Sequence, residues 1–145
     1  MANNFESSWK MNVGINNVAS YQVSGRPFAS GNINAADAHK IEFPFVTRWI
    51  MITNKSEAGG TGVRVGYSEA GISGSNYFVI PSGSASERLE VKVSEIWLYG
   101  CAANGAVGSG AYTTNVDVAA GMTSILPVRT SGSKGPSWSG SSGVG

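Results

Sequence analysis

The most regular feature of the chain is a two-residue alternation of large and polar side chains in short segments. Residues 63–68 place their large side chains on one parity, and residues 89–93 alternate aliphatic side chains with Glu90 and Lys92. A strand buried on one face requires this period, whereas a helix would repeat every three or four residues. These segments therefore predict half-buried β-strands.

The alternation changes parity after Ser94. Ile96 and Leu98 then carry the aliphatic set, while Trp97 and Tyr99 occupy the opposite parity. A shift of one residue moves every side chain to the other face of a strand, so a bulge or a tight turn is expected next to Ser94. The aliphatic side chains that follow are predicted to be core.

Other segments complete an all-β pattern. Residues 41–54 are apolar on both parities and are interrupted at Pro44, which predicts a short strand, a break and a strand buried on both sides. Further strands are expected at residues 18–23, 77–80 and 112–118, the last continuing at 122–126, whereas 35–39 holds one helical turn at most. The prediction is a single jelly-roll β-sandwich of about eight antiparallel strands, with a looser sandwich as the alternative.

Glycine and serine distribution separates a central domain from two arms. With 145 residues the chain fits one domain, which we expect at residues 16–129. Residues 1–15 form an N-terminal arm, and the Gly/Ser-rich residues 130–145 are too polar to order themselves, so both arms are expected to be flexible. Trp9 and Trp138 lie in these arms, where each is either an anchor for a neighbouring subunit or a residue that folds back on its own domain.

Charge is scarce and nearly balanced. Charged residues make up 13% of the chain, with 10 Lys and Arg against 9 Asp and Glu and a net charge of +1. A nearly neutral surface favours association with other protein, and the absence of a basic run disfavours nucleic-acid binding. The sequence has neither a basic, apolar leader nor an apolar stretch long enough to span a bilayer, so neither a signal peptide nor membrane insertion is expected.

Candidate chemistry is sparse. The chain has one histidine, His39, and one cysteine, Cys101, which are too few for a zinc site and cannot supply a disulfide within the chain. Glycoside hydrolysis is the enzyme class hardest to dismiss, because two facing carboxylates among Glu42, Glu90 and Glu95 would suffice. Glu90 and Lys92 share a strand face, however, and a weak surface ion pair is the simpler interpretation. We expect no enzymatic activity, no cofactor and no metal.

Residues 45–54, 63–68, 75–80 and 88–98, in this order and spacing, resemble the single jelly-roll penton proteins of nucleocytoplasmic large DNA viruses, such as those that infect algae. The resemblance covers roughly residues 40–100, and the flanks match nothing in the family. It implies a structural role: a homopentamer at each fivefold vertex of the virion, assembled in the host cytoplasm. Major capsid protein trimers would surround the pentamer and minor capsid proteins would lie beneath it.

Large aromatic and arginine side chains outside the expected core are the candidates for intersubunit contacts, because such residues dominate interface energetics. These candidates are Trp9, Arg48, Trp49, Arg64, Trp97, Tyr99 and Trp138. The main alternative function is a carbohydrate-binding β-sandwich or host-attachment module, in which Trp97 and Tyr99 would stack on sugar rings. The sequence leaves these two functions open.

Overall fold

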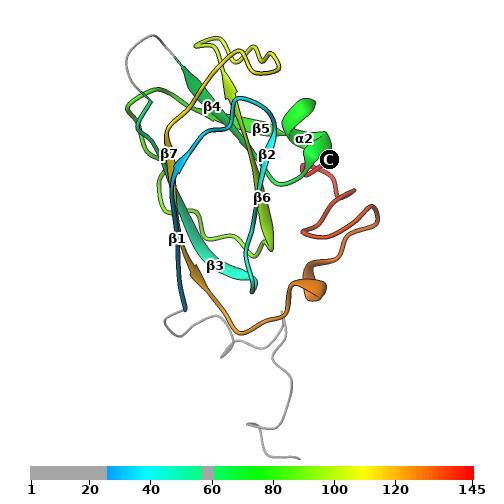
Figure 1. The fold of residues 1–145 in the computed structure, drawn as a ribbon. Helices are drawn as coiled ribbons and strands as arrows, with labels where there is room; N and C mark the ends of the chain where they lie inside the picture. The colour runs from blue at the N-terminus through cyan, green and yellow to red at the C-terminus, as the bar shows by residue number, and fades with distance from the viewer. Residues whose placement is uncertain (1–25, 57–60) are drawn as a thin grey trace, which may run out of the picture.

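The computed structural model describes residues 26–56 and 61–145, which form two antiparallel β-sheets packed face to face (Figure 1). This arrangement confirms the predicted all-β sandwich. The strands are β1 (Arg26–Ile33), β2 (His39–Glu42), β3 (Thr47–Asn54), β4 (Gly62–Gly66), β5 (Tyr77–Ile80), β6 (Glu95–Cys101) and β7 (Val116–Met122). The helical elements of the described residues are the short helix α2 (Glu69–Ser73) and a 3-10 helix (Pro127–Thr130).

The strands pair from the outside of the sequence inward, so that the first described strand pairs with the last and the middle strands pair with each other. One sheet has the order β1-β7-β3 and the other has the order β2-β6-β4-β5. Residues 84–89 extend the first sheet, because Leu89 and Ile50 exchange two backbone hydrogen bonds of 2.9 Å and the Ser86 N–H donates to the Ile52 carbonyl. Thus β1 pairs with β7, β2 with β6, β3 with residues 84–89, and β4 with β5, as in a long hairpin that has been rolled up.

The inner faces of the two sheets form a single hydrophobic core. Alternate residues of the strands point inward, and their aliphatic side chains are almost fully buried. Burial of each large aliphatic side chain stabilises the fold by about 1.5–3 kcal/mol. The side chains with 0% exposure include Ile50, Ile52, Val63, Val65, Ile96, Leu98 and Val116. The prediction that Ile96 and Leu98 are core residues is confirmed.

The parity change at Ser94 marks a crossover between the sheets. Residues 84–93 run beside β3, where the Thr47 hydroxyl donates to the Val91 carbonyl and the Thr47 N–H donates to the Val93 carbonyl. The chain bends at Ser94 and enters β6 of the opposite sheet. The inward parity must change there because the core now lies on the other side of the strand.

Strand β3 is not buried on both sides as predicted. Its residues alternate from Ile50 onward, and Met51 is 39% exposed on the outer face. Met51 is therefore an apolar residue on the outer surface of the sheet, and no described segment covers it. Sequence pattern alone cannot distinguish an apolar residue on an uncovered face from one in the core.

Helix α2 was not expected from the sequence. Ser68 caps it, accepting a hydrogen bond from the Gly71 N–H at 2.9 Å, and Ile72 is fully buried against the outer side of the β2-β6-β4-β5 sheet. A Cβ on Gly66 would lie 3.3 Å from Ile72 Cδ1 and 3.1 Å from the Asn76 carbonyl oxygen. Gly66 therefore permits the close approach of another segment.

Residues 130–145 were expected to form a flexible C-terminal arm, but in the structure they fold back onto the sandwich. Ser137 is fully buried, and its hydroxyl accepts from the backbone N–H groups of Ser94 and Glu95. Trp138 packs against the core, and its Nε1–H donates to the Lys92 carbonyl. One tryptophan and a few serine hydroxyls order a segment whose average composition is that of a linker. The expected strand at residues 18–23 lies outside the described residues.

Candidate interaction faces

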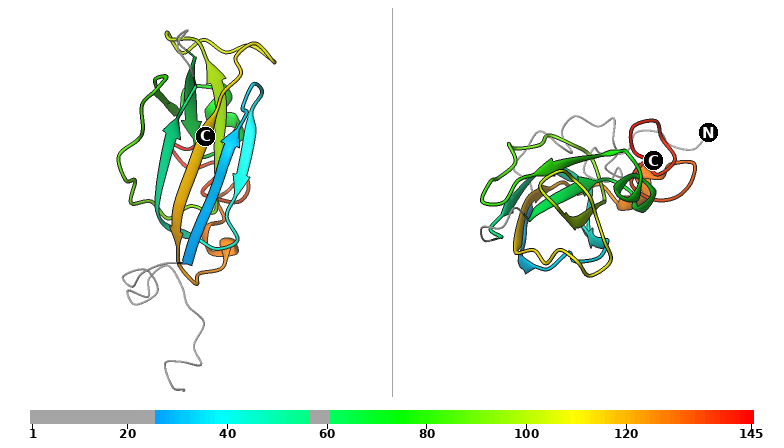
Figure 2. Two further views of the ribbon diagram at one scale, coloured as in Figure 1. Left: turned by 60° about the vertical axis from the view of Figure 1, so that its left-hand side comes forward. Right: turned by 90° about the horizontal axis from the view of Figure 1, so that it is seen from above.

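The sandwich has two outer faces that differ in what covers them. The outer surface of β1, β7 and β3, which we call the open face, has no other described element packed on it (Figure 2). The outer surface of β2, β6, β4 and β5, which we call the covered face, carries helix α2 and the C-terminal residues 131–145 (Figure 1). The two faces therefore offer different kinds of binding surface.

Small and weakly polar side chains form the centre of the open face. Ala29 and Gly31 of β1, Ala119 of β7, and Met51 and Thr53 of β3 line a shallow groove of about 470 Å³. Apart from Met51, this centre has few groups to desolvate and few long side chains to immobilise, which favours contact with another protein surface.

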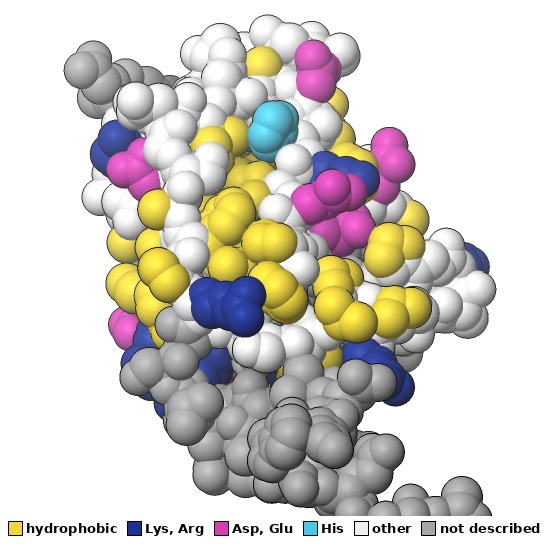
Figure 3. All heavy atoms as spheres, turned by 60° about the horizontal axis from the view of Figure 1, so that its bottom comes forward, with side chains coloured by type: hydrophobic (Ala, Val, Ile, Leu, Met, Phe, Trp, Pro, Cys, Tyr) yellow, Lys and Arg dark blue, Asp and Glu magenta, His cyan; other side chains and the backbone are white. Residues whose placement is uncertain are grey.

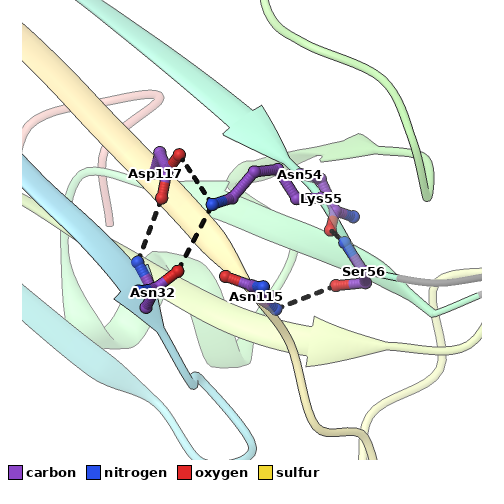
Figure 4. A network of polar contacts seen from close by, with 6 residues as sticks. All are labelled: Asn32, Asn54, Lys55, Ser56, Asn115 and Asp117. Carbon is purple, nitrogen blue, oxygen red and sulfur yellow. Dashed lines mark hydrogen bonds and ion pairs between the residues drawn. The ribbon is translucent and has the colours of Figure 1, made fainter.

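The charges at one end of the open face neutralise one another (Figure 4). Asp117 Oδ1 accepts from the Asn32 backbone N–H at 3.0 Å, and Asp117 Oδ2 lies 3.0 Å from Lys55 Nζ, which also donates to Asn32 Oδ1 at 3.3 Å. The Asn32 hydrogen bond first, and the Lys55 ammonium second, hold the pKa of Asp117 below its ordinary range. Behind this network, Ser56 Oγ accepts from the Asn115 N–H.

Arg48 and Trp49 lie at the other end of the open face. The Trp49 indole lies directly over Gly121, where an added Cβ would be 2.3 Å from Trp49 Nε1. Arg48 and Trp49 line a second hollow of about 480 Å³ together with Pro27 and Arg88. The structure thus brings these two predicted residues together on one surface.

Arg64 makes its contacts within its own chain. It is 9% exposed, its Nε–H donates to the Gly105 carbonyl at 2.9 Å, and its Nη1 donates to the Ile72 carbonyl at 3.0 Å. Its guanidinium carbon lies 3.9 Å from the centre of the Tyr77 ring. These contacts connect β4 to helix α2 and to the loop after β6.

Trp97 and Tyr99 point outward from β6 on the covered face. The Trp97 Nε1–H donates to Glu95 Oε2 at 2.6 Å, and Lys40 Nζ lies 6.0 Å from the centre of the Trp97 ring. Lys40 also forms an ion pair of 2.7 Å with Glu42, whose hydrogen bond is the main cause of the raised pKa of Lys40. Tyr99 is half-buried two residues farther along the strand.

A cleft of about 340 Å³ separates Trp97 from the elements that cover it. Glu95 and Trp97 form its floor, and helix α2 and the C-terminal residues form its walls. The residues that line it are Lys40, Ser68, Glu69, Ala70, Glu95, Trp97, Lys134, Pro136, Ser139 and Gly145. The sequence pattern placed Trp97 on the side of its strand opposite the aliphatic residues, but nothing in the sequence indicated that helix α2 and the C-terminal residues would form the walls of this cleft.

A third surface lies at the end of the sandwich where β1 begins. Phe28 and Phe43 make an edge-to-face contact with ring centres 4.9 Å apart, and the Arg26 guanidinium lies 4.4 Å from the Phe45 ring. Figure 3 shows hydrophobic side chains gathered in the middle of this end, with acidic side chains clustered on one side. Of the candidates in the arms, Trp138 folds back on its own domain, whereas Trp9 lies outside the described residues.

Catalytic and metal-binding groups are dispersed in the described part of the chain. His39 is exposed at the start of β2, and Glu90 forms an exposed ion pair of 2.7 Å with Arg88. Within residues 26–56 and 61–145, no group of three or more His, Cys, Asp or Glu side chains is close enough to hold a metal ion. Burial raises the pKa of the Cys101 thiol. Across the same residues, no helix is both long and apolar enough to cross a membrane.

No protein-family model matches the chain, and no curated protein matches it. A proposal about function therefore depends on the fold, on the surfaces described above and on the resemblance noted in the sequence.

Proposed function

We propose that this chain is a structural capsid protein, a single jelly roll that forms the pentameric capsomer at the fivefold vertices of an icosahedral large DNA virus. The observation that carries the proposal is the nested pairing of seven strands and residues 84–89. A jelly roll is an eight-stranded, two-sheet fold built from such pairing, and capsid proteins are one of its common uses. The blocks that resemble penton proteins fall on β3, β4, β5, β6 and residues 84–89.

The open face supplies a surface for self-association. Its centre is a shallow groove lined mainly by small residues, and Met51 is one of three large hydrophobic side chains that are exposed among the described residues. Interface centres are depleted in charge, as the centre of this face is. A second copy of this chain is the proposed occupant, and five copies would close a ring by cyclic symmetry.

The remaining partners follow from the resemblance. Major capsid protein trimers would surround the ring and minor capsid proteins would contact it from inside the shell. The low charge of the whole chain favours association with other proteins. The proposal includes neither nucleic-acid binding nor direct membrane insertion.

A charge placed at the centre of the open face tests the association. Met51→Glu would bury an uncompensated carboxylate in the ring contact, so we expect the pentamer fraction in native mass spectrometry to fall at least about tenfold. Val128→Glu makes the same chemical change at a side chain that is 66% exposed on the 3-10 helix, outside both sheet faces, and should leave assembly unchanged.

Location in an intact particle decides the proposal. Electron cryo-microscopy of virions should show density for this chain at the fivefold vertices, because the proposed role is to close the shell there. Density for this chain at any other shell position would overturn the proposal.

A further inference from the structure

The cleft over Trp97 contains a buried carboxylate whose hydrogen-bonding capacity is only partly used. Glu95 is 6% exposed, and its Oε2 accepts from the Trp97 Nε1–H. Its Oε1 accepts no hydrogen bond from any described residue. A buried carboxylate oxygen without a donor is unfavourable, so this atom is satisfied only by water or by hydroxyl or N–H groups of a ligand in the cleft.

The rest of the cleft fits a small polar molecule with one apolar side. Trp97 is half-buried and leaves part of its indole exposed to the cleft. The hydroxyl-bearing residues Ser68 and Ser139 line the walls, and the cleft volume of about 340 Å³ is within the range of small-molecule sites. Such sites combine an aromatic surface with a few oriented polar groups.

The charges around the cleft favour a neutral ligand. Glu69 and Glu95 are balanced by Lys40 and Lys134, so neither an anion nor a cation meets a surface of opposite sign. A guanidinium or ammonium group seated on the Trp97 ring would also meet Lys40, whose Nζ already lies 6.0 Å from the ring centre. A neutral molecule with several hydroxyl groups has no such conflict.

We propose that this cleft is a saccharide-binding site, in which the apolar side of one sugar ring packs on Trp97 and its hydroxyl groups donate to Glu95. Lys40 donates to a remaining sugar oxygen, and the Ser139 hydroxyl, whose hydrogen is donated to the Pro136 carbonyl, accepts from a sugar hydroxyl. This site uses the covered face, so it is compatible with assembly through the open face and adds a recognition role to a shell protein. A surface saccharide on a host cell is the class of ligand that such a role requires.

NMR of the full-length chain tests the site through the Trp97 Nε1–H signal, which is assigned by its loss in Trp97→Phe. The probes are methyl glycosides of glucose, galactose, mannose, N-acetylglucosamine and N-acetylgalactosamine, together with sialyllactose and N-acetylarginine amide. At least one saccharide should shift the signal saturably at millimolar concentration. The Glu95→Gln variant should weaken that binding about tenfold, because it removes a charged acceptor. Glu90→Gln, which changes an exposed carboxylate outside the cleft, should not.

A blocking variant keeps the test valid if changes at Glu95 affect folding. Ala70 is exposed on helix α2 and lines the cleft, so Ala70→Phe should abolish the shift, while Ser73→Phe on the same helix outside the cleft should retain it. If no saccharide shifts the signal, or if Ala70→Phe leaves the shift intact, the proposal is overturned. A response to the arginine amide alone would instead identify a site for basic side chains. None of these outcomes alters the pentamer measurement, so the two proposals fail separately.

Discussion

Removal of the Trp138 side chain is the most direct test of the folded-back C-terminal segment. Trp138 packs on the core cluster, and its Nε1–H donates to the Lys92 carbonyl. If residues 130–145 were a flexible arm, Trp138→Ala would leave the free energy of unfolding unchanged. If they are docked, the substitution removes the largest apolar side chain of the segment and one hydrogen bond.

The structure sets the size of the expected loss. Truncating a fully buried tryptophan to alanine costs about 3–5 kcal/mol, and the partial burial of Trp138 lowers this packing contribution to about 2–3 kcal/mol. The lost donor to the Lys92 carbonyl adds about 1 kcal/mol. The backbone at residue 138 has φ of 63°, which alanine does not relax, so no compensating gain is expected. The total is about 3–4 kcal/mol, or roughly 10 °C in Tm.

Urea denaturation followed by far-ultraviolet circular dichroism measures this loss without relying on tryptophan fluorescence. Trp138→Phe is the matched control, because it keeps most of the packing and removes only the N–H donor, for an expected cost of about 1 kcal/mol. A loss below about 1 kcal/mol for Trp138→Ala, or equal losses for the two variants, would refute the docking of this segment on the core.

Three further predictions concern local contacts. Gly121→Ala should cost about 1–3 kcal/mol and shift the Trp49 Nε1–H NMR signal, because the new Cβ would lie 2.3 Å from Trp49 Nε1. A ¹³C NMR titration should give the Asp117 carboxyl a pKa below its ordinary value, and this pKa should rise in Lys55→Met. Because the pKa is lowered in the folded chain, the Asp117 contacts stabilise the fold at pH values above the ordinary pKa, and this stabilisation is lost as the pH falls through the lowered value. Cys101 should react with a disulfide reagent at least about a hundredfold more slowly in the native chain than in urea, since burial raises the pKa of its thiol.

Local alternation predicted most of the strands because each one buries a single face against the same core, but it did not predict β1. β4, β5 and β6 appear at the expected residues, and the break at Pro44 separates β2 from β3. The expected strand at residues 112–118 begins only at Val116, because Thr114 uses its hydroxyl to bond the loop backbone at Ile33 and Ala35 instead. Polar residues that satisfy loops carry no period that a sequence pattern can reveal.

Features made by contacts between distant segments were not predictable from the sequence. The open face has the small residues Ala29, Gly31 and Ala119 at its centre, and small residues give no signal in a hydrophobic pattern. The cleft over Trp97 needs walls from helix α2 and from the C-terminal segment, which meet only in the folded chain. The sequence pattern placed only Trp97 of this cleft, on the side of its strand opposite the aliphatic residues.

The position of β7 has a consequence for the timing of synthesis. β7 is the central strand of its sheet, with β1 on one side and β3 on the other, yet it is the last of the described strands to be synthesised. Arg26 at the start of β1 pairs with Met122 at the end of β7, so β1 cannot complete its pairing until β7 has been synthesised. A nascent chain has no open face until β7 is inserted, and only finished subunits would be competent to join a growing shell.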